Sequence, residues 1–134
     1  MSAATDADTS PLTGEQLLEI ARAAAGSTGC PACAALVCPG WESLPAGFDT
    51  GVLRALGTLR QGEDEPGWDE FHPDGTRLWS PDAPIAPRHH PYHRCDVAAC
   101  SGCGRAFLRY TEFGGYYVDQ RVRALDPALV RTDA

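Results

Sequence analysis

Apolar residues near the N-terminus recur at the spacing of one helix face: Leu17, Ile20, Ala21 and Ala24. This period predicts an amphipathic helix over about residues 13–25. Thr13 is a favourable N-cap, and Gln16 follows three residues later, as in a capping box. Gly26 ends the helix, because glycine commonly follows the last helical turn.

The last third of the chain alternates between apolar and polar positions, which is the pattern of a strand with one buried face. Residues 105–112 and 116–125 flank Gly114-Gly115, so the sequence predicts a β-hairpin in this region. Arg123 falls on the polar face of the second strand. We therefore expect its side chain to face solvent.

Weaker patterns predict three further elements: a short helix at 49–57 capped by Asp49, a hairpin at 68–80 that turns at Asp74-Gly75, and a short final helix that begins at Asp126-Pro127. Residues 81–93 contain four prolines and are expected to form an ordered, extended loop. The stretch "RQGEDEPG" reads as an acidic loop, and residues 1–10 read as a flexible tail. Residues 11–134 are then expected to form a single domain.

Charge is distributed unevenly along the 134 residues, although the net charge is −7. Residues 1–75 carry twelve acidic and three basic side chains, whereas residues 76–109 carry five Arg and two Asp. An acidic chain disfavours general binding to a phosphate backbone. The N-terminus has no basic and apolar leader, and no apolar run is long enough to span a bilayer, which predicts a cytoplasmic protein without a membrane segment. In that compartment the six cysteines are metal ligands or thiols rather than disulfides.

The cysteines form two mirrored clusters, C-x2-C-x4-C and C-x4-C-x2-C. Each C-x2-C pair suits a tight turn whose two thiolates grip one side of a metal ion, and two such turns complete a tetrahedral site. The sequence therefore predicts one structural Zn²⁺ bound by Cys30, Cys33, Cys100 and Cys103. A redox role for "CPAC" is disfavoured, because a thioredoxin-like motif needs a strand before it and a long helix after it.

These residues resemble the zinc-ribbon superfamily, including small ribbon proteins of bacterial type. The resemblance rests on "CPAC" at 30–33 and on "CSGCG" at 100–104, which leads into the predicted hairpin. It implies a structural metal and a small antiparallel sheet, and it implies no particular activity. The 66 residues between Cys33 and Cys100 would form a loop-rich insertion. The predicted fold class is therefore α+β, a small zinc ribbon with antiparallel hairpins and an N-terminal helix.

Cys38 and Cys95 remain outside this ligand set, and three interpretations stay open. They are buried thiols that face each other on neighbouring strands, or a disulfide, or members of a second metal or loop site with the histidines of "RHHPYHRC", which are His89, His90 and His93. Nothing in the spacing of these residues distinguishes among the three.

Two groups of residues are candidate binding surfaces: the aromatic side chains around the Gly-Gly turn, Tyr110, Phe113, Tyr116 and Tyr117, and the positive pair Arg88 and Arg94. The chain contains no nucleophile elbow, phosphate-binding loop or zincin motif. We therefore expect a non-enzymatic zinc protein that acts as a regulatory or interaction module with a protein partner. The alternatives are a nucleic-acid-binding ribbon that uses Arg77, Arg88, Arg94, Arg105 and Arg109, and a metal-dependent enzyme that uses the three histidines.

Overall fold

The computed structural model describes residues 11–60 and 67–133. The predicted tail at 1–10 and most of the acidic loop, at 61–66, lie outside the described residues. In the described part no helix is long and apolar enough to cross a membrane.

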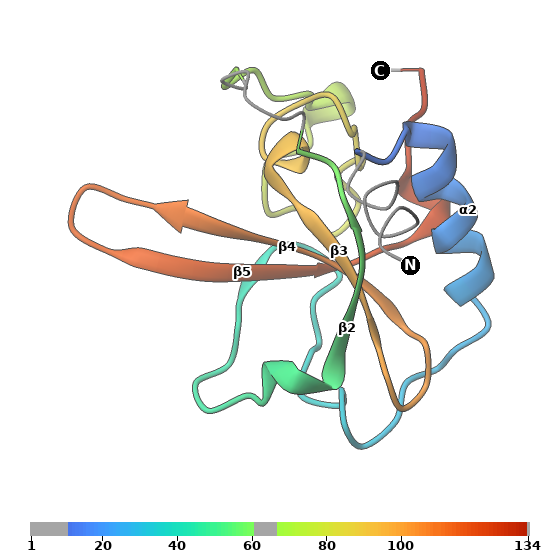
Figure 1. Ribbon diagram of the computed structural model, residues 1–134. Coiled ribbons are helices and arrows are strands. Elements are labelled where there is room, and N and C mark those ends of the chain that lie inside the picture. Colours follow the sequence, from blue (N-terminus) through green and yellow to red (C-terminus); the bar gives the residue numbers. More distant parts are fainter. Residues whose placement is uncertain (1–10, 61–66, 134) are drawn as a thin grey trace, which may run out of the picture.

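The centre of the fold is one antiparallel sheet of five strands in the order β1-β5-β4-β3-β2 (Figure 1). The strands are β1 (Glu42–Ser43), β2 (Leu53–Thr58), β3 (Asp96–Cys100), β4 (Ala106–Phe113) and β5 (Val118–Ala124). The β4–β5 hairpin turns at the predicted Gly-Gly pair and projects from the body of the molecule (Figure 1). In the residues that the structure describes, an α-helix and an antiparallel sheet confirm the expected α+β class.

The N-terminal helix α2 (Gly14–Ala24) follows from local sequence signals. The Thr13 hydroxyl accepts a hydrogen bond from the backbone N–H of Gln16, and the Gln16 side chain accepts one from the backbone N–H of Thr13. This reciprocal pair is the predicted capping box. Leu17 and Ala21 are fully buried, so the helix packs its apolar stripe into the core as its spacing requires.

Apolar side chains pack on both faces of the sheet, because β4 is buried on both sides. Leu108 belongs to a cluster that contains Leu17 of α2, whereas Phe107 belongs to a second cluster with Leu36 and Cys33. Successive strand residues point to opposite faces of the sheet, so Phe107 and Leu108 pack into different clusters. The second core contains the segment that follows α2, which is how the first cysteine pair is held against the sheet.

Two predicted elements are wrong in type. Residues 49–57 form a short 3-10 turn (Thr50–Val52) and then β2 rather than a helix. Asp49 still caps the turn, through a hydrogen bond from the N–H of Gly51. The segment forms a strand because Leu53 is buried and β2 pairs along β3. This pairing supplies backbone hydrogen bonds that the local sequence pattern does not reveal.

The hairpin predicted at 68–80 keeps its turn but lacks its strands. Asp74 and Gly75 both have positive φ, 59° and 77°, as a tight turn requires. The two arms do not pair, because they contact different parts of the fold. The carbonyl of Asp69 accepts a bond from the N–H of His90, and the other arm runs beside Gly40 at Trp79.

Arg123 also departs from the prediction, because its side chain is completely buried. Its guanidinium donates to the carbonyls of Pro39, Pro81 and Ala83 and to the hydroxyl of Tyr92. Among the described residues no carboxylate lies within 4.0 Å of it. The charge is therefore stabilised by carbonyl dipoles, and the side chain ties β5 to two distant loops. Beyond it, Asp126 caps the final short helix (Pro127–Leu129) as predicted.

Candidate metal centre

The first cysteine pair lies in a tight turn that follows α2. Gly29, with φ of 100°, reverses the chain just before the pair. The N–H of Cys33 then bonds the carbonyl of Cys30 at 3.1 Å, and the N–H of Leu36 bonds the carbonyl of Cys33 at 2.9 Å. We call residues 30–33 the first knuckle.

The second pair occupies the turn between β3 and β4, and residues 100–103 form the second knuckle. The carbonyl of Cys100 accepts from the N–H of Gly104 at 2.7 Å, and the N–H of Cys100 bonds the carbonyl of Arg105 at 2.8 Å. Gly104 has φ of 84°, a conformation that favours glycine. The strand pairing of β3 with β4 therefore fixes where these two sulfurs point.

The fold brings the four predicted ligands together. Their Sγ atoms all lie within 4.8 Å of one another, with Cys30–Cys100 at 3.6 Å and Cys33–Cys103 at 3.7 Å. Ligands at about 2.3 Å from one ion in a tetrahedron are about 3.8 Å apart. The four cysteines are thus placed as a tetrahedral thiolate site would place them, and they could hold a metal ion.

The two knuckles are packed so closely that no side chain fits between them at Gly102. A Cβ built on Gly102 would lie 2.8 Å from Sγ of Cys30 and 3.7 Å from Sγ of Cys100. No pattern used above to predict the site points to Gly102. Its position between the cysteines of the second knuckle was the signal that could have identified it.

The thiols of the centre differ in their surroundings. Burial raises the pKa of Cys33 to about 11. Hydrogen bonds from the Ser27 hydroxyl and then from the backbone N–H of Arg105 lower the pKa of Cys103 to about 6. The lowered pKa favours the thiolate form of Cys103, and a bound divalent cation would deprotonate the remaining thiols.

Arg105 connects the two knuckles outside the ligand set. Its Nη1 donates to the carbonyl of Leu36 at 3.0 Å, and its guanidinium lies 4.8 Å from the ring centroid of Phe107. The residue that follows the second knuckle is thereby bonded to the segment that follows the first. This contact holds the two halves of the site in register.

Cys38 and Cys95 lie apart from the centre and apart from each other. Both thiols are free and buried, but Cys38 belongs to the core that contains Phe107 and Cys95 to the core that contains Leu108. The idea that they face each other on neighbouring strands is wrong, because the sheet separates them. Burial raises the pKa of both thiols, to about 11 for Cys38.

The three histidines do not join these cysteines as a ligand set. Within the described residues, the four knuckle cysteines are the sole group of three or more His, Cys, Asp or Glu close enough to share an ion. His90 and His93 are buried, and Nδ1 of His90 accepts from Nε of Arg94 at 3.1 Å. Burial lowers the pKa of both rings.

The candidate surface residues are divided by the fold. Phe113, Tyr116 and Tyr117 are 75%, 104% and 55% exposed at the hairpin tip, whereas Tyr110 is buried edge-on against Trp41. Arg88 is exposed. Arg94 is half-buried, with its guanidinium 4.0 Å from the ring centroid of Trp68.

The basic residues considered for nucleic acid do not all lie together. Arg94 precedes the start of β3, whereas Arg105 bonds to its last residue, so the two lie at opposite ends of the β3–β4 pair. Comparisons with family models, with curated proteins and with solved structures found no match.

Proposed function

We propose that the four knuckle cysteines bind one structural Zn²⁺ in a site of zinc-ribbon type. The carrying observation is the spacing of the sulfurs, 3.6 and 3.7 Å for the cross-knuckle pairs. Zinc favours four thiolates in a tetrahedron, and four protein ligands leave no open position for substrate or water. A closed site of this kind supports a structural role for the ion.

The position of the centre supports the same role. Cys33 and Cys100 are buried in the core that also contains Phe107, while Cys30 and Cys103 are half-buried at its edge. An ion there would join two segments that are far apart in the chain. Because such a site does not exist in the unfolded chain, the binding energy of the metal becomes folding energy.

We further propose that the protein is a non-enzymatic interaction or regulatory module whose partner is another protein. The exposed aromatic residues at the tip of the β4–β5 hairpin support this, because aromatic side chains are enriched at interfaces and rarely gather in solvent without a reason. The excess of acidic residues over positions 1–75 would favour a basic partner for that half. Six free thiols suit a reducing, cytoplasmic setting.

The structure gives less support to the two alternatives, a nucleic-acid-binding ribbon and a metal-dependent enzyme. The arginines that a nucleic-acid interface would use do not form one described surface, since Arg94 stacks on Trp68 and Arg105 bonds to Leu36. A metal enzyme that uses the histidines would need all three to converge on one ion, and among the described residues they form no such ligand group. The His90 ring lies tilted against Trp68 and edge-on to Tyr110.

The test of the metal is X-ray absorption on the protein purified with its metal. Four sulfur neighbours around zinc support the proposal, and a mixed nitrogen and oxygen shell contradicts it. The test of the role is affinity purification from an extract of the protein's own cells. We expect a partner that is lost when Phe113 and Tyr116 are replaced by serine, and recovery of no protein contradicts the role.

A further inference from the structure

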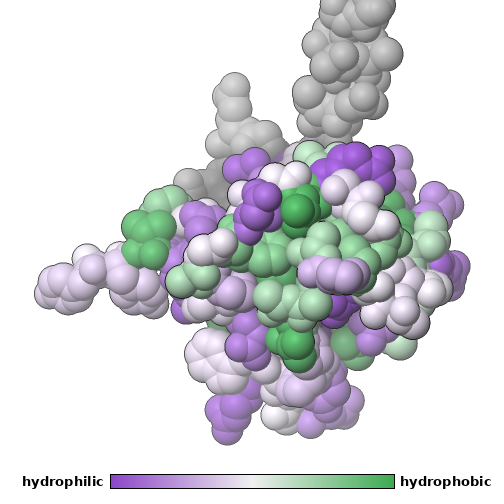
Figure 2. Space-filling view, turned by 90° about the horizontal axis from the view of Figure 1, so that it is seen from below, coloured by the Kyte–Doolittle hydropathy of each residue, from purple (hydrophilic) through white to green (hydrophobic). Residues whose placement is uncertain are grey.

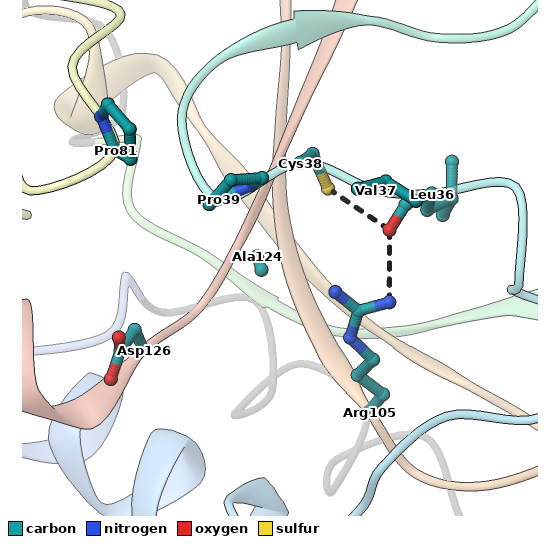
Figure 3. A pocket seen from close by; sticks show the side chains of 8 residues that line it. All are labelled: Leu36, Val37, Cys38, Pro39, Pro81, Arg105, Ala124 and Asp126. Carbon is teal, nitrogen blue, oxygen red and sulfur yellow. Dashed lines mark hydrogen bonds between the residues drawn. The ribbon is translucent and has the colours of Figure 1, made fainter.

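A pocket of about 250 Å³ lies beside the metal centre, where the segment after the first knuckle meets the end of β5 and the loop at Pro81 (Figure 3). Apolar atoms of Leu36, Val37, Pro39 and Ala124 line it. Small-molecule sites usually measure roughly 300–1,000 Å³. This pocket is below that range, which suits one side chain better than a whole cofactor.

The wall formed by Val37 continues into an apolar surface. Val37 is 77% exposed, and no charged residue occurs between Gly26 and Trp41. Pro31, Ala34 and Ala35 in the same stretch are exposed as well. Figure 2 views the molecule from the end that carries the knuckle turns and shows hydrophobic side chains gathered across that face, with hydrophilic ones around it. Apolar surface that is contiguous and ringed by polar residues is typical of an interaction site.

One arginine lines the pocket, and a second lies near it. Arg105 lines it, and Arg123 lies behind it, bonded to the carbonyls of Pro39 and Pro81. Neither guanidinium has a described carboxylate within 4.0 Å. The Cys38 thiol in the wall lies near charges of both signs: burial raises its pKa to about 11, Arg105 and more weakly Arg123 oppose that rise, and Glu42 adds to it.

One carboxylate, that of Asp126, also borders the pocket. It is exposed, and Figure 3 places it across Ala124 from Arg105. Its Oδ1 already accepts from the N–H of Ala128. Arg105 uses one N–H on the carbonyl of Leu36, so its other donors are available to a ligand. The Arg105 side of the pocket is therefore complementary to an anion.

We propose that this pocket docks a peptide segment of a partner protein, taking one apolar side chain while Arg105 binds a neighbouring carboxylate of the same peptide. The inference rests on the proposed role as a protein-interaction module and assigns it a second surface, apart from the hairpin tip. An apolar anchor in a pocket, with a charged group fixed beside it, is the usual form of a binding hot spot. The acidic peptide meets this local positive site even though the whole chain carries a net charge of −7.

The test is an amide NMR titration of the zinc-loaded protein with Gly/Ser peptides that carry a central Leu-Asp pair. We expect the amide signals of Val37, Arg105 and Ala124 to shift. A peptide with Leu-Asn in place of Leu-Asp should bind about tenfold more weakly, because it loses one charge-assisted hydrogen bond. Arg105→Gln should bring the two peptides to equal affinity.

Two valines give a matched pair of variants. Val37→Asp puts a carboxylate in the pocket wall and should abolish binding of the Leu-Asp peptide. Val118→Asp changes a similarly exposed valine, 63% against 77%, at the distant hairpin tip and should leave binding unchanged. Both side chains are exposed, so neither change disturbs a core.

Four results would overturn the inference. The first is that no amide signal at the pocket shifts, and the second is that the wild type binds the Leu-Asp and Leu-Asn peptides equally. The third is that isovalerate, a free apolar carboxylate, binds as tightly as the peptide. The fourth is that the same signals shift with protein concentration in the absence of peptide, which would make a second copy the occupant. If affinity purification captures a partner but the peptide titration gives no shift at the pocket, the pocket inference fails and the proposed function stands. If no partner is captured at all, the proposed function fails, and the peptide titration still decides whether the pocket binds.

Discussion

Gly102 lies directly against the sulfur of Cys30, so Gly102→Ala perturbs the metal centre without removing a ligand. The new Cβ would stand 2.8 Å from that sulfur, at least 0.6 Å closer than the 3.4 Å at which ordinary contact begins. Ligand distances in a metal site tolerate about 0.2 Å. One knuckle must therefore move by about three times that tolerance. We expect zinc affinity to fall about 10- to 100-fold, the range typical of substitutions beside metal ligands.

The assay is competition for zinc against a chromophoric chelator. Gly26→Ala is the matched control, because a Cβ at Gly26 meets nothing within 4 Å and the residue follows α2 outside the knuckles. Its zinc affinity should equal that of the wild type. If Gly102→Ala also keeps its affinity to within about twofold, the sulfurs do not form one tightly packed site.

Three further predictions concern the buried polar groups. Arg123→Met should lower the free energy of unfolding in urea by about 3 kcal/mol, because several buried acceptors lose their donor. Replacement of the exposed Arg54 by Met should leave the free energy of unfolding almost unchanged, and an equal decrease in both variants would contradict the prediction. Cys38 and Cys95 should resist iodoacetamide until the protein unfolds, since both are buried and their pKa values are raised; labelling of the folded state would contradict their burial. Burial lowers the pKa of His93 below its usual 6.5, so the unfolded chain binds more protons and stability falls as pH drops below 6.5. The loss of stability between about pH 7.5 and 5.5 should be smaller in His93→Gln, and an unchanged loss would contradict the link.

Local signals explain what could be predicted from the sequence. The capping box of Thr13 and Gln16 involves residues three apart, and it forms as expected. The knuckle pairs Cys30–Cys33 and Cys100–Cys103 are also local, because each depends on one tight turn. The cysteine spacing in two such turns is enough to propose the four metal ligands, even when the structure of the residues between the two turns is not predicted.

Long-range contacts explain what was missed. β2 is a strand because it pairs with β3, more than 35 residues further along the chain. Arg123 is buried because it bonds to acceptors that lie 31 to 84 residues away in the chain. Its position in an alternating pattern gives no sign of such distant partners. The pocket is assembled in the same way, from Leu36, Pro81 and Arg105 in three separate segments. No window of sequence contains enough of these partners to reveal them.

The most direct test of the metal centre is a native mass spectrum of the purified protein, set beside the spectrum of the denatured chain. The difference in mass counts the bound metal, and the denatured mass shows how many thiols are reduced. We expect one zinc ion and six reduced cysteines, four of them as ligands. A metal-free protein whose cysteines are paired in disulfides would contradict the zinc site and the reducing setting proposed for the protein.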